Sequence, residues 1–270
     1  MKKSTKTTSI LALDIGNTSI TFAGIRGKKI EVLRNVKTIA KERDIVKILN
    51  LCLKKIASPI EAVIICSVVP KMEKIVGDII KRKTTVKVYI IGKDIKVPLK
   101  SKYNPKQIGQ DRLVCAYAAG VLYGAPALVV DLGTATTLDI VSKRNEYLGG
   151  IIIPGIEMSA ESLFKNTALL PKITITRPQA LIGKDTQNSI LSGIFYGYGE
   201  MIHGLIGLIA RKSHIKPKVI VTGGYLRLMK SYIAGKVTAF DRDLVFKGLG
   251  VLWEDRVKRQ RLKDMQKGHI

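Results

Sequence analysis

The stretch that decides the fold is Asp14-Ile15-Gly16-Asn17-Thr18, which lies between two short apolar segments, Ile10–Ile15 and Ile20–Ile25. A similar pattern returns later in the chain as Asp131-Leu132-Gly133-Thr134-Ala135-Thr136, again between apolar segments. Runs of β-branched residues bounded by Gly, Asn and Asp are typical of strands joined by a tight turn. Two copies of one strand–acid–glycine–hydroxyl hairpin indicate an internal duplication.

The segments around the two hairpins alternate between strand and helix patterns, which is typical of α/β proteins. We therefore expect two α/β domains, residues 1–118 and 119–270, with a cleft between them. Helices are predicted at 42–57, from Pro70, from Asp111 to Tyr123, and at 156–169, 186–211 and 242–258. The further predicted strands are Glu31–Lys37, Ala62–Val69, Val86–Ile91, Ala127–Leu132, Thr137–Val141, Tyr147–Ile153, Ile173–Thr176, Val219–Thr222 and Val237–Phe240.

The composition is that of an ordinary globular protein, with 270 residues, 46% of them hydrophobic and 25% charged. No uninterrupted apolar run reaches the roughly 18 residues of a membrane span, and Asp14 breaks the first apolar run, against a secretory leader. The three cysteines, an odd number without paired spacing, favour a reduced compartment. These features predict a cytoplasmic protein without a membrane partner.

The net charge of +25 favours anionic partners such as nucleotides. It also leaves a nucleic-acid partner open. Aromatic residues do not interleave with the basic stretches as stacking platforms would. We therefore interpret most of these stretches as solvated faces and disfavour nucleic acid as a partner.

The glycine hairpins are candidates for phosphate binding. A glycine in a tight turn permits a positive φ and a close approach by phosphate, and Asp14 can hold the water around Mg²⁺. Thr222-Gly223-Gly224 forms a third such element, whose glycines permit close contact with a flat ligand. The plainer alternatives are an ordinary β-turn and a strand–helix turn. The sequence contains neither a P-loop lysine motif nor a GxGxxG fingerprint.

Asp111 is the candidate general base. It follows Gly109 and precedes Arg112 at the start of a predicted helix, where the guanidinium and the helix N-terminus would keep the carboxylate ionised. The alternative is that Asp111 only caps that helix. None of the three histidines stands in a nucleophile pattern.

Together these elements resemble the phosphate and adenosine loops of the actin-like ATPase superfamily, and more narrowly the type III pantothenate kinases. The ordered segments that carry the resemblance include Asn104-Pro105 with Gly109-Gln110-Asp111-Arg112, Asp131–Thr137, Gly149-Gly150 with Pro154-Gly155, Ile182–Thr186 and Ser192–Gly197. The resemblance implies duplicated actin-like, ribonuclease H-like domains with mixed sheets. It also implies ATP, Mg²⁺ and a monovalent cation, K⁺ or NH₄⁺, as cofactors.

The resemblance assigns a role to each candidate residue. Asp111 is the catalytic base and Asp131 the ligand of the monovalent cation. The nucleotide contacts are Asp14, Ile15, Gly16, Asn17, Thr18, Ser19, Ile20, Thr21, Thr134, Gly223 and Gly224. The substrate contacts are Gly109, Gln110, Asp111, Arg112, Thr186 and Tyr103.

Two of these assignments carry further consequences. The family has a substrate-contacting tyrosine where this chain has Lys102, so Tyr103 fills the role only if the loop shifts by one residue. Thr186 corresponds to a contact reached from a partner subunit, which implies a homodimer with a shared site.

The function that follows is ATP-dependent phosphorylation of pantothenate to 4′-phosphopantothenate, the first step of coenzyme A synthesis. Two alternatives remain open. One is a sugar or polyol kinase of the same fold, since a fold alone does not fix a substrate. The other is a non-enzymatic, transcription-accessory or nucleic-acid-associated relative, which the high positive charge suggests.

Overall fold

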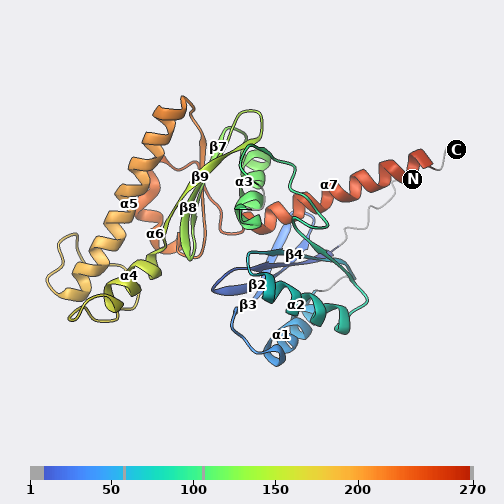
Figure 1. Ribbon diagram of the computed structural model, residues 1–270, viewed down its shortest axis with the longest axis horizontal. Helices are drawn as coiled ribbons and strands as arrows, with labels where there is room; N and C mark the ends of the chain where they lie inside the picture. Colours follow the sequence, from blue (N-terminus) through green and yellow to red (C-terminus); the bar gives the residue numbers. More distant parts are fainter. Residues whose placement is uncertain (1–8, 57–58, 105–106, 268–270) are drawn as a thin grey trace. The chain divides into compact units, whose positions relative to one another are not determined.

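The computed structural model describes residues 9–56, 59–104 and 107–267, which form two compact units (Figure 1). Described residues up to Leu99, Asn104–Ala118 and those from Asp243 onward form the first unit; Lys100–Tyr103 and Ala119–Arg242 form the second. One boundary of this division falls between Ala118 and Ala119, and the last helix belongs to the first unit.

The first unit contains a five-stranded mixed sheet in the order β3-β2-β1-β4-β5. β1 runs antiparallel to β2 and parallel to β4. The strands are β1 (Ser9–Ile15), β2 (Ser19–Arg26), β3 (Lys29–Lys37), β4 (Ile60–Ser67) and β5 (Lys87–Ile90).

Helices cover both faces of this sheet. Successive residues of a strand point to opposite faces, so each apolar strand contributes to two cores. Leu11 and Leu13 of β1 join one hydrophobic core with α1 (Glu42–Lys55) and α2 (Pro70–Lys83). Ile10 and Ala12 join the other core with α7 (Leu244–Lys267) and the first half of α3 (Gln110–Tyr123).

The second unit contains a six-stranded sheet in the order β11-β10-β7-β8-β9-β6. Its strands are β6 (Lys100–Ser101), β7 (Ala127–Leu132), β8 (Ala135–Val141), β9 (Glu146–Pro154), β10 (Lys218–Thr222) and β11 (Ala239–Phe240). Three helices pack on one face of this sheet (Figure 1): α4 (Ile156–Lys165), α5 (Thr186–Ser213) and α6 (Leu226–Ile233), which a short 3₁₀ turn, η2 (Ala234–Lys236), follows.

The two sheets confirm the predicted duplication. The order β9-β8-β7-β10-β11 repeats β3-β2-β1-β4-β5, with antiparallel and parallel pairs in the same places. Asp14 and Asp131 occupy matching positions near the end of the first strand of each repeat. Asp14 pairs with Cys66 on the neighbouring parallel strand, and Asp131 pairs with Thr222.

Several predicted elements differ from those observed. Ile173–Thr176 is not a strand; Ile173 and Ile175 pack against the second unit's core without ladder partners, between Pro171 and Pro178. Helix α4 ends at Lys165 rather than at 169, and α7 continues past 258 to Lys267 because its tail is rich in helix-forming Arg, Lys, Gln and Leu. The expected helix end at residue 57 lies outside the described residues.

Within the described parts of the chain, none of the helices combines the length and the apolarity that crossing a bilayer requires.

Candidate active site

The first hairpin is held by hydrogen bonds that leave its tip exposed. The Gly16 N–H donates to the Ser19 carbonyl at 2.9 Å, and the Thr38 hydroxyl donates to the Gly16 carbonyl at 2.6 Å. The Thr38 N–H donates to the Thr18 carbonyl at 3.0 Å. Because Asn17 and Thr18 are exposed above this clamp, their polar groups can reach a ligand.

The other hairpin residues differ in what they can offer a nucleotide. Ile15 and Ile20 are fully buried in the core, so only their backbone groups can contact a ligand. Ser19 and Thr21 accept hydrogen bonds from the Asn35 amide at 3.2 and 2.8 Å. These contacts fix the start of β2 behind the tip.

Gly16 does not play the conformational part that the sequence suggested. Its φ is not positive, and an added Cβ would meet the Ser19 carbonyl at 3.5 Å, an ordinary contact. The turn closes through the hydrogen bond between Gly16 and Ser19 instead. Gly16 contributes instead by lacking a side chain, which leaves room for a ligand beside the turn.

Asp14 and Asp111 lie close to the same buried thiol. Cys66 of β4 is fully buried, and burial raises the pKa of its thiol well above the usual range. The carboxylates of Asp14 and Asp111 raise this pKa further, followed by that of Glu73. The structure therefore brings the Asp14 hairpin and the candidate base together within the first unit.

Glycines shape the surroundings of Asp111. Its Oδ1 accepts the Arg112 N–H at 2.8 Å, and a Cβ at Gly109 would lie 2.5 Å from that same Oδ1. Gly92, with φ +86°, leaves room for the Gln110 side chain, which a Cβ would approach to 2.8 Å. Sequence reasoning missed Gly92, although the Gly-Lys-Asp sequence after a strand indicated a turn there.

In the second unit, the loop after Asp131 packs against the Gly223–Gly224 turn. The Tyr225 N–H donates to the Leu132 carbonyl at 3.1 Å. Gly223 has φ +99°, and a Cβ there would collide with Asp131 Oδ1 and would lie 2.5 Å from the Leu132 nitrogen. The two elements that the sequence placed far apart are therefore neighbours.

Gly155 supports the same loop from the other side. A Cβ at this position would collide with the Thr134 carbonyl and would lie 2.6 Å from that of Gly133. Gly155 was noted in the sequence only as part of a family motif. Thr134 itself is exposed at the tip of the hairpin, as Thr18 is in the first unit.

A groove of about 440 Å³ opens beside Tyr225, the residue that follows the double glycine. The Tyr225 hydroxyl donates to Glu157 at 2.9 Å. Burial, followed by this hydrogen bond, raises the pKa of Tyr225. The groove therefore has a neutral aromatic wall next to the glycine turn.

Thr186 and Tyr103 belong to the second unit, whereas Asp111 belongs to the first. Thr186 is the exposed first residue of α5, and Asp185 caps that helix by accepting the Asn188 N–H at 2.8 Å. Hydrogen bonds from Asn188 lower the pKa of Asp185. Tyr103 stacks edge-to-face on Tyr147 at a centroid distance of 6.5 Å and remains partly exposed.

Each of the two hairpins has one acidic residue, Asp14 in the first and Asp131 in the second. The described residues contain no group of three His, Cys, Asp or Glu side chains placed to hold a metal ion. One carboxylate beside a candidate phosphate-binding turn is nevertheless a donor set that suits Mg²⁺, which commonly takes one or two carboxylates together with phosphate oxygens and water.

Duplicated mixed sheets with paired acid–glycine hairpins define the actin-like ATPase fold. The chain superimposes on MreB5 of Spiroplasma citri, solved with AMPPNP bound, with a TM-score of 0.52 and 13% identity over 97% of this chain and 99% of that one. A conserved protein of Campylobacter jejuni, assigned to the Baf family of transcriptional activators, gives a TM-score of 0.59 and 19% identity over 92% and 100%. Likenesses at this identity show the fold alone.

Sequence similarity identifies the family. Residues 10–207 match the family model described as type III pantothenate kinase. The type III pantothenate kinase of Persephonella marina is 43% identical over 222 residues, covering 80% of this chain and 87% of the relative. That of a Geobacillus species is 35% identical over 257 residues, covering 93% and 99%. The chain belongs to the type III pantothenate kinase family.

Proposed function

We propose that this chain transfers the γ-phosphoryl group of ATP to the primary hydroxyl of pantothenate, giving 4′-phosphopantothenate and ADP at the first step of coenzyme A synthesis. Membership of the family supports this activity and substrate. The structural observation that carries the proposal is the convergence of Asp14 and Asp111 on Cys66. This convergence supports a phosphate-binding role for the Asp14 hairpin and the role of base for Asp111.

Asp111 takes the part of the base. Its carboxylate orients the substrate hydroxyl and accepts its proton as the hydroxyl oxygen bonds to the γ-phosphorus and the bond to the β–γ bridging oxygen breaks. Gly109, Gln110 and Arg112, the neighbours of Asp111 in the sequence, would contact pantothenate. Tyr103 is proposed as a further substrate contact.

The hairpins hold the triphosphate. Backbone N–H groups of Asp14–Thr21 and the exposed hydroxyls of Thr18 and Thr134 are suited to phosphate oxygens. Mg²⁺ would be held near Asp14, and it would neutralise charge on the phosphates. The nucleoside part would lie at Gly223–Gly224, where the groove beside Tyr225 has room for a flat ring.

Asp131 is proposed to bind a monovalent cation, K⁺ or NH₄⁺. Such an ion next to the phosphates would supply the positive charge that a P-loop lysine supplies in other kinases. With Na⁺ or choline replacing K⁺, the wild-type rate should fall, whereas Asp131→Asn should be slow and insensitive to this exchange. An equal K⁺ response in both proteins would remove Asp131 from this role.

The activity test uses purified protein with ATP, Mg²⁺, K⁺ and pantothenate, and it measures phosphopantothenate directly. Asp111→Asn should lower kcat about 10²–10⁴-fold, the usual contribution of a general base, and leave ATP affinity unchanged. Asp78→Asn is the matched control, since Asp78 is an exposed carboxylate of the same unit. Faster turnover of a sugar than of pantothenate would favour the polyol-kinase alternative.

We further propose that the enzyme is a homodimer that pairs through α5. Gly193, Gly197 and Gly204 lie on one exposed face of this helix, and a Cβ at each would meet nothing within 4 Å. Exposed Leu208 continues this face at the same helical spacing, and Thr186 begins it. A second helix can approach such a face closely and bring Thr186 to the partner's site.

The dimer can be tested by the size of the particle in solution. Gly197→Arg should turn a dimer into a monomer in light scattering, whereas Gly235→Arg, at another exposed and open glycine, should not. A monomeric wild type would refute the proposed pairing.

Sharing of the site can be tested by mixing two inactive variants, Asp111→Asn and Thr186→Arg. If Thr186 acts across the interface, half of the randomly paired dimers regain one of their two sites, about a quarter of wild-type activity. If Thr186 acts within its own chain, the mixture stays inactive.

A non-enzymatic, nucleic-acid-associated role is the less favoured alternative. The matched family is one of kinases, and the actin-like likenesses show fold only. Salt-sensitive binding to duplex DNA without phosphopantothenate formation would favour this role. The three cysteines are free and buried, which supports our placement of the enzyme in the reducing cytoplasm.

A further inference from the structure

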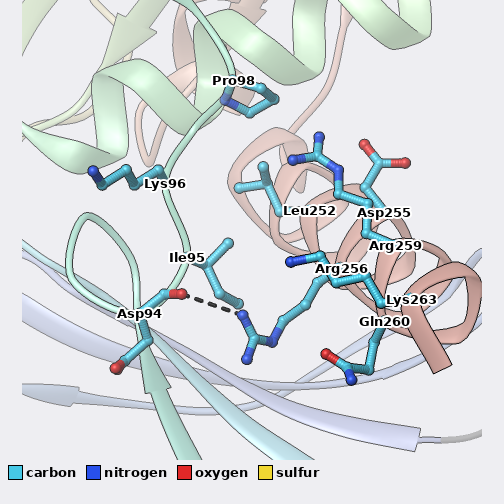
Figure 2. A pocket seen from close by; sticks show the side chains of 10 residues that line it. All are labelled: Asp94, Ile95, Lys96, Pro98, Leu252, Asp255, Arg256, Arg259, Gln260 and Lys263. Carbon is cyan, nitrogen blue, oxygen red and sulfur yellow. Dashed lines mark hydrogen bonds between the residues drawn. The ribbon is translucent and has the colours of Figure 1, made fainter. Parts of the chain in front are cut away.

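Besides the groove beside Tyr225 in the second unit, a cavity of about 230 Å³ lies in the first unit, between the segment 94–98 and helix α7 (Figure 2). Its charged lining residues are Asp94, Lys96, Asp255, Arg256, Arg259 and Lys263. None of them belongs to the hairpins or to the Gly109–Arg112 segment proposed for kinase chemistry.

The cavity has an excess of positive charge. Four cationic side chains line it against two carboxylates. Both carboxylates accept hydrogen bonds from neighbours: Asp94 from the Ile90 N–H at 2.8 Å and Asp255 from the Tyr117 hydroxyl at 2.7 Å. Among the residues that the structure describes, none of the four cations forms an ion pair. The lining as a whole therefore carries a net positive charge.

The cations of α7 share one face of the helix. Arg256, Arg259 and Lys263 follow the spacing i, i+3 and i+7, and Figure 2 shows them extending toward the segment 94–98. Lys96 stands on the opposite wall and points away from α7, which makes it peripheral.

One of the guanidinium groups is already fixed in place. The Arg256 guanidinium lies 4.5 Å from the centroid of the Tyr89 ring and donates to the Asp94 carbonyl at 3.3 Å. Contact with an aromatic face and a carbonyl restrains the side chain without neutralising its charge. Part of the entropy cost of ordering the site is therefore met before any ligand binds.

We propose that this cavity is an anion site that binds a phosphate group with two negative charges, either free phosphate or the phosphate of a small phosphomonoester. Guanidinium forks match phosphate oxygens in pairs, and the three cations that α7 contributes to the cavity can offset the negative charge of such a group. The cavity is smaller than the roughly 300–1,000 Å³ of pockets that enclose whole drug-sized ligands. It therefore accommodates the phosphate and little more.

The chain provides its own optical probe for this site. Trp253 is the single tryptophan, and its ring lies 5.2 Å from the Tyr89 ring on which Arg256 rests. An anion bound by Arg256 should therefore change Trp253 fluorescence. Titration with inorganic phosphate and with glycerol phosphate, at ionic strength held constant with chloride, should each give a saturable change. A stronger response to one of them identifies the source of the phosphate group.

Two double variants on one helix make the test specific. Arg259→Gln/Lys263→Gln should weaken binding at least about tenfold, because charge-assisted hydrogen bonds are lost. Lys258→Gln/Arg261→Gln removes the same charge from α7 outside the cavity and should change binding less than about twofold. Far-UV circular dichroism checks the fold, and Lys263→Gln alone serves if the double variant unfolds.

Three results would overturn the proposal: no saturable response, equal losses in the two double variants, or displacement of phosphate by duplex DNA at lower concentration. They indicate, respectively, no site, diffuse attraction, and a nucleic-acid surface. The titration contains neither ATP nor pantothenate, so an inactive kinase would leave its outcome unaffected.

Discussion

Gly223→Ala should destabilise the second unit and loosen the loop after Asp131. Gly223 adopts φ +99°, and its Cβ position is occupied by Asp131 Oδ1 and the backbone of Leu132. Neither the backbone conformation nor the space tolerates a methyl group. The β7 end must shift to accept one, and the Asp131 carboxylate must move with it.

The size of the effect follows from two costs. A non-glycine residue in a left-handed conformation costs about 1–2 kcal/mol. Forcing a methyl group into a packed site costs about 1–3 kcal/mol more. The sum, about 2–5 kcal/mol, corresponds to a fall in Tm of about 4–20 °C for a protein of roughly this size.

Gly224→Ala is the matched control, because a Cβ at Gly224 meets nothing within 4 Å and its φ is not positive. It should leave stability unchanged or raise it by up to about 1 kcal/mol. Thermal unfolding followed by circular dichroism compares the two variants, and isothermal titration with ATP shows whether the displaced loop binds nucleotide more weakly. Equal Tm values for the two variants would refute this reasoning.

Three further outcomes are expected. Gly109→Ala should push the Asp111 carboxylate out of place and lower kcat while ATP affinity stays constant, as steady-state kinetics and titration can show. All three cysteines are buried, and burial raises the pKa of Cys52 to about 11. The native protein should therefore not react with a thiol reagent at pH 8, whereas the denatured protein should show three reactive thiols. Burial and a hydrogen bond to a carboxylate raise the pKa of Tyr117 to about 12. Because the unfolded chain loses this proton near pH 10, the contribution of Tyr117 to the free energy of unfolding should be complete below pH 10 and lost as the pH rises through 12. In urea titrations, Tyr117→Phe should show a smaller loss of stability across that interval.

Local patterns were enough to predict the class of fold. The two hairpins were visible because each combines an apolar strand, an acid and a glycine within a few residues. The structure confirms that they begin equivalent halves of a duplicated mixed sheet. The neighbourhood of Asp111 and Gly109 was likewise evident from adjacent residues in one segment.

Features that depend on packing between distant segments were not predictable in this way. The apolar residues of 242–258 indicate a helix, but nothing local says that Leu249 and Trp253 pack on β1 and β4 of the first unit. Ile173 and Ile175 alternate like a strand but are partly buried without forming one, because no edge of the sheet pairs with them. The two-residue strand β6 was missed because a partner strand defines it rather than its own sequence.

The return of the last helix to the first sheet sets an order for assembly on the ribosome. Residues 119–242 emerge as one block and, together with Lys100–Tyr103, contain every strand of their own sheet. The earlier strands must wait with one apolar face uncovered until Phe246, Leu249 and Trp253 have been synthesised. The first unit, whose strands are translated first, is therefore completed last. Premature termination near residue 240 would leave a fragment with exposed apolar surface, which depends on chaperones.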